Sequence, residues 1–277
     1  MAAPMFEPAE QRPGAPAWSL SLTDPARAAV EFALLIGTLP LRRALPTGDG
    51  HPVLVLPGLL AGDGSTLALR RILRRLGYRV HGWRLGRNIG PTAQAVAGMG
   101  ERLQDLHTRY RAPVTVIGWS LGGIYARAMA RRGPEVIRQV ITLGTPFRLM
   151  HHNQTRASAA FNRFSHLHIE RARVPLDLET EPLPVPATSV YSRCDGVVAW
   201  QACVDLQSPQ AENIAVIGSH FGYGHNPAVI WVVADRLAQA RGTWAPFRPP
   251  AVLRPLFPRP DAPYEPSSPA EAPTRLA

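Results

Sequence analysis

The stretch VTVIGWSLGG, residues 114–123, decides the fold. Its residues 114–117 are typical of a short buried strand, and a tight turn and a helix from Leu121 are expected to follow. Ser120 lies at the apex of that turn, between Gly118 and Gly122. A strand that reverses sharply into a helix leaves no room for side chains at 118 and 122. The pattern therefore predicts a strained turn that exposes the Ser120 hydroxyl beside a helix N-terminus.

Strands and helices alternate on both sides of this stretch. The sequence predicts further strands over residues 53–56, 78–83, 136–143, 188–191 and 213–217. It predicts helices over residues 25–39, 65–76, 92–110, 121–132 and 227–240. This alternation favours an α/β fold, with a mostly parallel central sheet and helices on both faces. Open sheets of this kind place their sites at the carboxyl ends of the strands.

Two polar residues downstream of Ser120 stand at such strand ends. Asp195 follows the strand over 188–191 in a turn, and His220 comes directly after the strand over 213–217. A serine hydroxyl needs a base to take its proton and a third group to orient that base. We expect His220 to be the base and Asp195 the orienting acid.

Each of these two positions has a competitor nearby. His225 lies five residues beyond His220, at the start of the next predicted helix. Asp205 stands further into a loop than Asp195 does. We favour His220 and Asp195 because each follows its strand more directly.

Composition limits the remaining possibilities. The chain has 277 residues, enough for one large domain, and a net charge of +10 that comes entirely from arginine. No nucleic-acid motif accompanies that charge, so no nucleic-acid partner is expected. The pattern offers no close cluster of metal ligands, and we expect no metal and no cofactor. The N-terminus lacks the features of a signal peptide and no apolar run would span a bilayer, which predicts a cytoplasmic protein.

Two cysteines, Cys194 and Cys203, are too few for a disulfide framework, although they allow one bridge. Residues 1–49 are expected to form a loose tail, over 1–21, and then an apolar helix over 25–39 that Asp24 caps and Pro25 starts. That helix is expected to pack on the domain, with weak contact to a membrane surface as the alternative.

The main domain is expected over residues 50–242. Residues 147–186 interrupt its alternation, and we expect them to form a lid-like insertion with a helix over 154–171. Histidines are frequent there, but their spacing does not favour a metal site. Residues 243–277 are proline-rich and are expected to be disordered or draped over the surface.

Six segments together resemble a known family. They are PGLLAGD (57–63), LGRNIGPT (85–92), GWSLGG (118–123), TLGTPF (142–147), SRCDGVVAW (192–200) and GSHFGYGHNPAV (218–229). They look like bacterial α/β-hydrolases of the lipase/esterase type, and are similar to the triacylglycerol esterase or lipase group of the EstA kind. The resemblance covers about residues 50–242. It implies a Ser-Asp-His esterase in which Ser120, Asp195 and His220 match the catalytic triad.

The α/β-hydrolase pattern also suggests which backbone groups would bind an oxyanion. One donor comes from the loop after the strand over 53–56, where Leu59 is the natural candidate, and the other is the N–H of Leu121. Pro57 stands where many lipases have a histidine before the glycine, which leaves only the backbone donor at this loop.

The sequence therefore predicts a serine hydrolase that cleaves a small-molecule or lipid-like carboxylic ester. An acyltransferase using the same three residues on an alcohol or lipid acceptor is the first alternative. A non-catalytic binding protein that retains the fold is the second.

Overall fold

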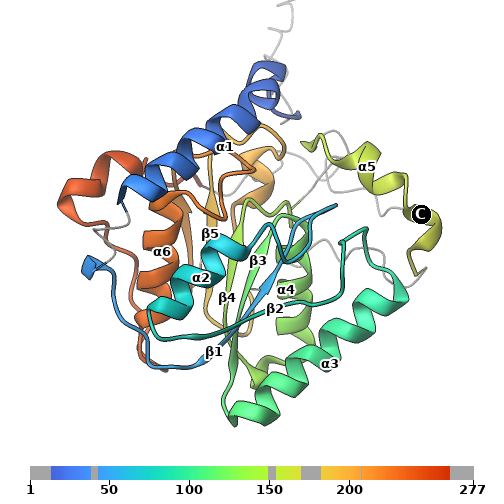
Figure 1. Cartoon of the computed structure of the whole chain (residues 1–277), viewed down its shortest axis with the longest axis vertical. Coiled ribbons are helices and arrows are strands. Elements are labelled where there is room, and N and C mark those ends of the chain that lie inside the picture. The colour runs from blue at the N-terminus through green and yellow to red at the C-terminus, as the bar shows by residue number, and fades with distance from the viewer. Residues whose placement is uncertain (1–13, 39–42, 149–153, 170–181, 207, 263–277) are drawn as a thin grey trace, which may run out of the picture.

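The computed structural model describes residues 14–38, 43–148, 154–169, 182–206 and 208–262. In that part of the chain six strands form a single sheet, with every neighbouring pair parallel, in the order β2-β1-β3-β4-β5-β6 (Figure 1). The strands are β1 (Pro52–Leu56), β2 (Arg79–Gly82), β3 (Val114–Trp119), β4 (Ile137–Leu143), β5 (Ala187–Tyr191) and β6 (Ala211–Ala215). All six predicted strands are thus confirmed, with shifts of up to two residues at their ends.

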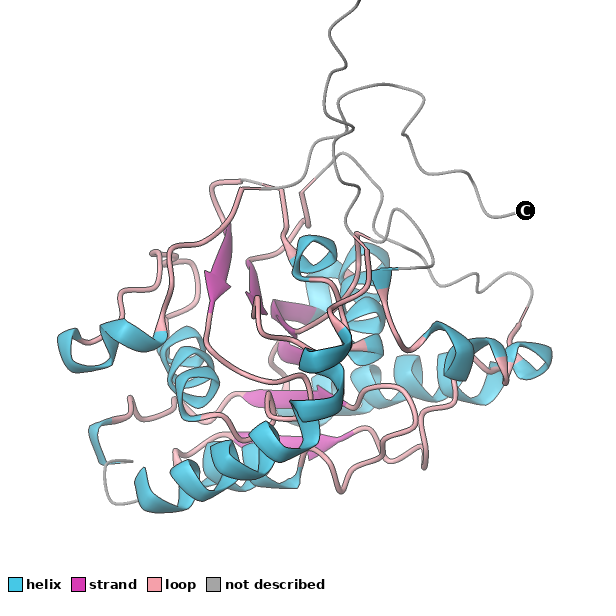
Figure 2. Cartoon of the chain, turned by 90° about the horizontal axis from the view of Figure 1, so that it is seen from above, coloured by secondary structure: helices cyan, strands magenta, loops and turns pink. Residues whose placement is uncertain are grey.

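Helices lie on both sides of the sheet (Figure 2). They are α1 (Trp18–Thr38), α2 (Leu67–Arg75), α3 (Ala93–Tyr110), α4 (Leu121–Arg132), α5 (Ser158–Asn162) and α6 (Pro227–Ala238). Alternate residues of β1 show how the faces separate. Val53 and Val55 belong to a core shared with α2 and α6, whereas Leu54 and Leu56 belong to a core shared with α3 and α4. Both cores are apolar, as the period of two along a strand requires when a sheet is covered on both faces.

The order of the strands determines where a site can form. The chain passes from β1 to the edge strand β2 on one side, then crosses to β3 on the other side of β1. Such a reversal opens a crevice at the carboxyl ends of the two central strands. The loop after β1 and the turn at Ser120 after β3 both lie there, because Leu56 pairs with Gly118 in the register of the sheet.

Helix α1 differs from the prediction for residues 25–39. It begins at Trp18, includes Pro25, and so extends into the segment expected to be a loose tail. Asp24 does not cap it, because Asp24 is a fully buried residue inside the helix. The buried face consists of Asp24, Ala28, Glu31 and Leu35, at spacings of four, three and four residues.

The apolar residues expected to pack inward mostly face outward. Val30, Phe32, Leu34 and Ile36 are exposed, whereas Leu35 is buried. The helix does pack on the domain, beside α6, but through a face that carries two carboxyl groups. Residue 39 lies outside the described residues.

The insertion over 147–186 contains less helix than expected. Instead of one helix over 154–171, the structure has the five-residue α5 and a short 3₁₀ turn, Ser165–Leu167. Near the two ends of the predicted helix, Thr155 forms an isolated β-bridge with Val198 and His168 forms one with Thr92. Residues in such bridges are extended, which limits the helix to the segment between them. Residues 149–153 and 170–181 of this segment lie outside the described residues.

The C-terminal segment up to residue 262 is draped over the domain. The rings of Phe247 and Phe257 contact each other in a tilted arrangement, with centroids 5.1 Å apart, and pack against the core around α6. Residues 263–277 lie outside the described residues. Cys194 and Cys203 are free thiols, so the bridge that the sequence allowed is not formed. Within the described residues, no helix is long and apolar enough to cross a bilayer.

Candidate active site

Ser120 occupies a strained turn between β3 and α4. Its backbone has φ 52° and ψ −123°, a conformation that side-chain-bearing residues rarely adopt. The turn is held by two backbone hydrogen bonds: Ser120 N–H donates to the Leu143 carbonyl at 2.8 Å, and Gly123 N–H donates to the Ser120 carbonyl at 2.9 Å. The strain predicted from the sequence is therefore present at the residue expected to carry it.

The glycines of this turn are required by close approaches. A side chain at Gly118 would collide with the backbone of Gly122 and Gly123. A Cβ at Gly122 would lie 2.5 Å from the Leu56 carbonyl and 2.7 Å from the Pro57 carbonyl. The crowding predicted at positions 118 and 122 is confirmed, and it packs α4 directly onto the end of β1.

Asp195 and His220 form a buried pair. His220 Nδ1 lies 2.7 Å from Asp195 Oδ2, and the residues are 4% and 2% exposed. The other carboxylate oxygen, Oδ1, accepts the backbone N–H groups of Val197 at 2.8 Å and Val198 at 2.7 Å. A carboxylate only accepts, so Nδ1 carries the proton and Nε2 of a neutral ring is left as an acceptor.

The two competing residues are engaged elsewhere. Asp205 makes a two-pronged ion pair with the buried Arg127, at 2.5 and 3.1 Å. His225 Nε2 lies 2.8 Å from the carbonyl oxygen of Ala28. Both contacts serve packing between elements, and neither residue joins the Asp195–His220 pair.

A tryptophan beside the serine connects the turn to the segment that carries the histidine. Trp119 Nε1 donates to the His220 carbonyl at 3.1 Å. No hydrogen bond between the Ser120 hydroxyl and His220 Nε2 occurs among the interactions of the described residues. The geometry therefore places an oriented histidine and a strained serine on segments tied to each other.

The loop after β1 lies against the serine. A Cβ at Gly58 would be 3.1 Å from the Ser120 Cβ, a tight contact that the glycine avoids. Its next residue is Leu59, the predicted oxyanion donor, and Leu121 is the first residue of α4. Neither the Leu59 nor the Leu121 backbone N–H donates to another group in the part of the chain that the structure describes.

Asn88 holds this loop in place, a role that the sequence analysis missed. Its side-chain amide donates to the Pro57 carbonyl at 2.9 Å, and its backbone carbonyl accepts from Leu60 N–H at 2.7 Å. Asn88 is completely buried, and its backbone N–H donates to the Ala61 carbonyl at 2.8 Å. Because one buried residue forms hydrogen bonds with Pro57, Leu60 and Ala61, it fixes the conformation of the loop. The only signal for this role was the polar Asn within LGRNIGPT.

The charges around His220 change its titration. Burial lowers the pKa of His220, but the Asp195 charge, the hydrogen bond from Nδ1 and the charge of Asp24 outweigh burial. The pKa of the imidazole therefore lies above its ordinary value of 6.5. A raised pKa is what a base needs in order to accept a proton from a weakly acidic hydroxyl.

The histidines of the insertion form no metal site in the described residues, where no group of three or more potential ligands occurs. His168 Nε2 instead contacts the Ile89 carbonyl at 2.9 Å, and its ring packs on Phe161. His151 and His152 lie outside the described residues.

Comparisons with known proteins agree with this architecture. No protein-family model and no curated protein matches the chain. Lipase B of Aspergillus fumigatus superposes with a TM-score of 0.56 at 16% identity, over 72% of this chain and 56% of that protein. The chain therefore spans little more than half the length of that lipase. One of the metagenome-derived lipolytic enzymes LipS and LipT gives 0.52 at 17% identity, over 69% of this chain and 93% of its own.

A third match is MGS-MChE2, an α/β hydrolase from a sediment metagenome of the lagoon of Mar Chica, Morocco. Its TM-score is 0.50 at 15% identity, over 69% of this chain and 91% of its own. Together with the parallel sheet, these matches show that the chain has the α/β-hydrolase fold. Identities this low do not separate the EstA-like group from other proteins of the fold, so that assignment stays a prediction.

Proposed function

We propose that the protein is a serine carboxylic-ester hydrolase that works through an acyl-enzyme on Ser120. One observation carries the proposal: a buried Asp195–His220 pair, joined at 2.7 Å, stands beside a strained serine turn at the carboxyl ends of the central strands. The lipolytic enzymes among the structural matches support this class of reaction.

In the first half of the reaction, Ser120 Oγ attacks the carbonyl carbon of the ester. His220 Nε2 takes the hydroxyl proton, while Asp195 holds Nδ1 and stabilises the imidazolium that forms. The carbonyl oxygen becomes an oxyanion, which the backbone N–H groups of Leu59 and Leu121 bind. When the tetrahedral intermediate collapses, the C–O bond of the ester breaks and Nε2 returns its proton to the leaving alcohol.

In the second half, water replaces the alcohol. Nε2 takes a proton from water as its oxygen attacks the acyl carbon, and the Ser120 oxygen leaves with that proton as the bond to the acyl group breaks. The products are a carboxylic acid and the free enzyme. If another alcohol attacks in place of water, the same steps yield a new ester, which is the acyltransferase alternative.

We expect the purified protein to hydrolyse p-nitrophenyl esters, and a panel of chain lengths tests this. Short soluble esters and long emulsified esters are assayed with and without an added acceptor alcohol.

The exposed apolar face of α1, with Val30, Phe32, Leu34 and Ile36, supports a preference for esters presented at a lipid surface. New ester in the presence of the alcohol would favour the transferase. No turnover of any ester would contradict the proposal and favour a binding protein.

The proposal also predicts how the rate depends on pH. His220 must be unprotonated at Nε2 to act as a base, so kcat/KM falls as the pH drops through the pKa of His220. Because neighbouring carboxylates raise this pKa, we expect the fall in kcat/KM on the acid side of the profile, called the acid limb, to have its midpoint above pH 6.5, the ordinary pKa of histidine. A kcat/KM profile for a soluble ester measures it, and a limb below 6.5 would show that His220 does not limit the reaction.

A further inference from the structure

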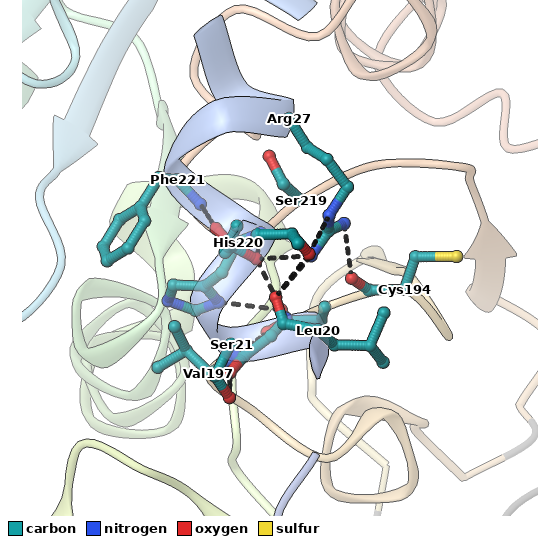
Figure 3. A network of polar contacts seen from close by, with 12 residues as sticks. Leu20, Ser21, Arg27, Cys194, Val197, Ser219, His220 and Phe221 are labelled. Carbon is teal, nitrogen blue, oxygen red and sulfur yellow. Dashed lines mark hydrogen bonds and ion pairs between the residues drawn. The ribbon is translucent and has the colours of Figure 1, made fainter. Parts of the chain in front are cut away.

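We propose that Asp24 on helix α1 is a positioning residue that fixes Asp195 and His220 relative to each other. The inference rests on the proposed function, because it concerns the same pair. For clarity, residues 192–199 are called the acid loop and residues 218–226 the histidine loop. Figure 3 shows backbone groups of both loops, among them those of Cys194, His220 and Phe221, gathered against α1.

One carboxylate oxygen of Asp24 joins the two loops. Asp24 Oδ2 accepts the N–H of Gly196, directly after Asp195, and the N–H of His220 itself, each at 2.9 Å. The other oxygen, Oδ1, accepts the N–H of Phe221 at 2.9 Å. Asp24 is fully buried and receives only donors, so it acts as a carboxylate. The two loops also meet directly, where the Ser192 hydroxyl accepts the Gly218 N–H at 3.2 Å, but Asp24 Oδ2 joins them beside Asp195 and at His220 itself.

The same helix also holds the other side of the acid loop. Arg27 Nη1 donates to the Cys194 carbonyl at 2.7 Å, and its other terminal nitrogen lies 3.2 Å from Asp24 Oδ2. Ser21 Oγ donates to the Gly196 carbonyl at 2.5 Å. The residues before and after Asp195 are thus both bound to α1.

A second carboxyl group, two turns along α1, binds the histidine loop further on. Glu31 Oε1 accepts the N–H of Ser219 at 2.7 Å, and Oε2 accepts from the Asn226 side chain at 3.1 Å. Asn226 in turn caps α6 through Ala228 N–H at 2.9 Å. Glu31 therefore holds the histidine loop at the residue before His220 and at Asn226, but it makes no hydrogen bond to the described residues of the acid loop.

Glycines make room for these carboxyl groups. A Cβ at Gly196 would lie 2.8 Å from Asp24 Oδ2, and one at Gly222 would collide with Glu31 Oε2. Helix α1 approaches the loops so closely only because these positions lack side chains. The approach explains why a helix with an apolar outer face nevertheless buries two acidic residues.

Asp24 also contributes charge. The titratable and charged groups around His220 are Asp195, Tyr223 and Cys203 from the domain, and Asp24, Arg27 and Glu31 from α1. Of these, Asp195 and Asp24 raise the pKa of His220. If α1 served only as structural support, neutralising Asp24 would leave the pKa of His220 unchanged. A change in that pKa therefore distinguishes a positioning role of Asp24 from a purely structural one.

The test compares Asp24→Asn with Glu31→Gln, two neutralised carboxyl groups on one helix face. In Asp24→Asn, one acceptor oxygen is replaced by a donor, so at least one of the three backbone N–H groups that Asp24 accepts, those of Gly196, His220 and Phe221, loses its acceptor. We expect kcat to fall roughly 10- to 100-fold with little change in KM, as misplacement of a catalytic pair does. The acid limb of kcat/KM is expected to shift to lower pH. Glu31→Gln is expected to lower kcat less and to leave the limb in place.

Controls keep each outcome decisive. Asp105→Asn, an exposed carboxyl on α3, is expected to match the wild type in both measurements. Wild-type kcat and an unmoved limb in a folded Asp24→Asn variant would overturn the proposal. If Asp24→Asn does not fold, the partly exposed Arg27→Gln carries the test, since it leaves the Asp24 carboxylate in place and removes the cation, its contact with the Cys194 carbonyl and its contacts within α1. A several-fold lower kcat is then expected, and wild-type kcat would overturn the proposal.

These results are separable from failure of the proposed function. If the wild type hydrolyses no ester, the proposed function fails before any variant is compared. Proton NMR of the buried Nδ1–H of His220 then still reports on α1, because this resonance is expected to shift in Asp24→Asn and to remain in Glu31→Gln. An identical resonance in all three proteins would contradict positioning by Asp24.

Discussion

Ser120→Ala is expected to lower kcat for p-nitrophenyl esters by at least about 10⁴-fold, because it removes the atom that attacks the ester. The change deletes only Oγ from a residue that is 7% exposed. The hydrogen bonds that hold the turn are made by backbone groups, so they persist. Urea unfolding should therefore give a midpoint close to that of the wild type, and the loss of rate can be assigned to chemistry.

The matched control for this variant is Thr243→Ala. It is an exposed residue whose hydroxyl donates to the Ala240 carbonyl at 2.9 Å, far from the turn in sequence. It should keep wild-type kcat and KM. Retention of substantial activity in Ser120→Ala would mean that the esters are cleaved elsewhere in the protein.

Asp195→Asn is expected to reduce kcat/KM by roughly 10³- to 10⁴-fold, because it puts the proton on the wrong nitrogen of His220. The N–H groups of Val197 and Val198 require an acceptor at the position of Oδ1. The amide oxygen therefore takes that place, and the amide NH₂ faces Nδ1. Nδ1 must then accept, which leaves the proton on Nε2, where it blocks transfer from Ser120.

Asp205→Asn is the informative comparison, since it also neutralises a buried aspartate. Asp205 pairs with Arg127, 3% exposed, and has no contact with His220. Its replacement should lower the free energy of unfolding by about 3 kcal/mol, typical for breaking a buried ion pair. Its kcat should stay within a few-fold of the wild type. If the two variants lost activity equally, Asp195 would have no special role.

The sequence predicted those features that depend on local patterns. The six strands and the turn at Ser120 follow from short, mostly apolar runs bounded by turn residues, and the structure confirms them. Asp195 and His220 were chosen by their place directly after strands, and the structure brings them into contact. The parallel sheet explains this success, since it gathers the carboxyl ends of all its strands at one edge.

The role of α1 was not predictable from local rules. Asp24 before Pro25 matches the start of a helix, yet the helix begins at Trp18, because its contacts with the loops outweigh the hydrogen bond that Pro25 cannot make. The apolar residues Val30 and Phe32 suggested the buried face, but they are exposed. The acidic residues are buried instead because backbone N–H groups distant in sequence need acceptors. Only the repeat of Asp24, Ala28, Glu31 and Leu35 pointed to the true face.

Asn88 shows the same limit on a smaller scale. Its contacts join it to Pro57, 31 residues away, and to the loop that carries the proposed oxyanion donor. Such a partner is chosen by the tertiary fold, and no spacing rule connects the two segments in sequence.

The central claim is that Ser120 is a nucleophile activated by His220, and covalent labelling tests it most directly. The protein is treated with a fluorophosphonate, digested, and the modified residue is identified by mass spectrometry. We predict one adduct, on Ser120, that forms in the wild type, forms far more slowly in Asp195→Asn and is absent from Ser120→Ala. An adduct on another residue, or an unlabelled Ser120 in a protein that still cleaves esters, would contradict the account.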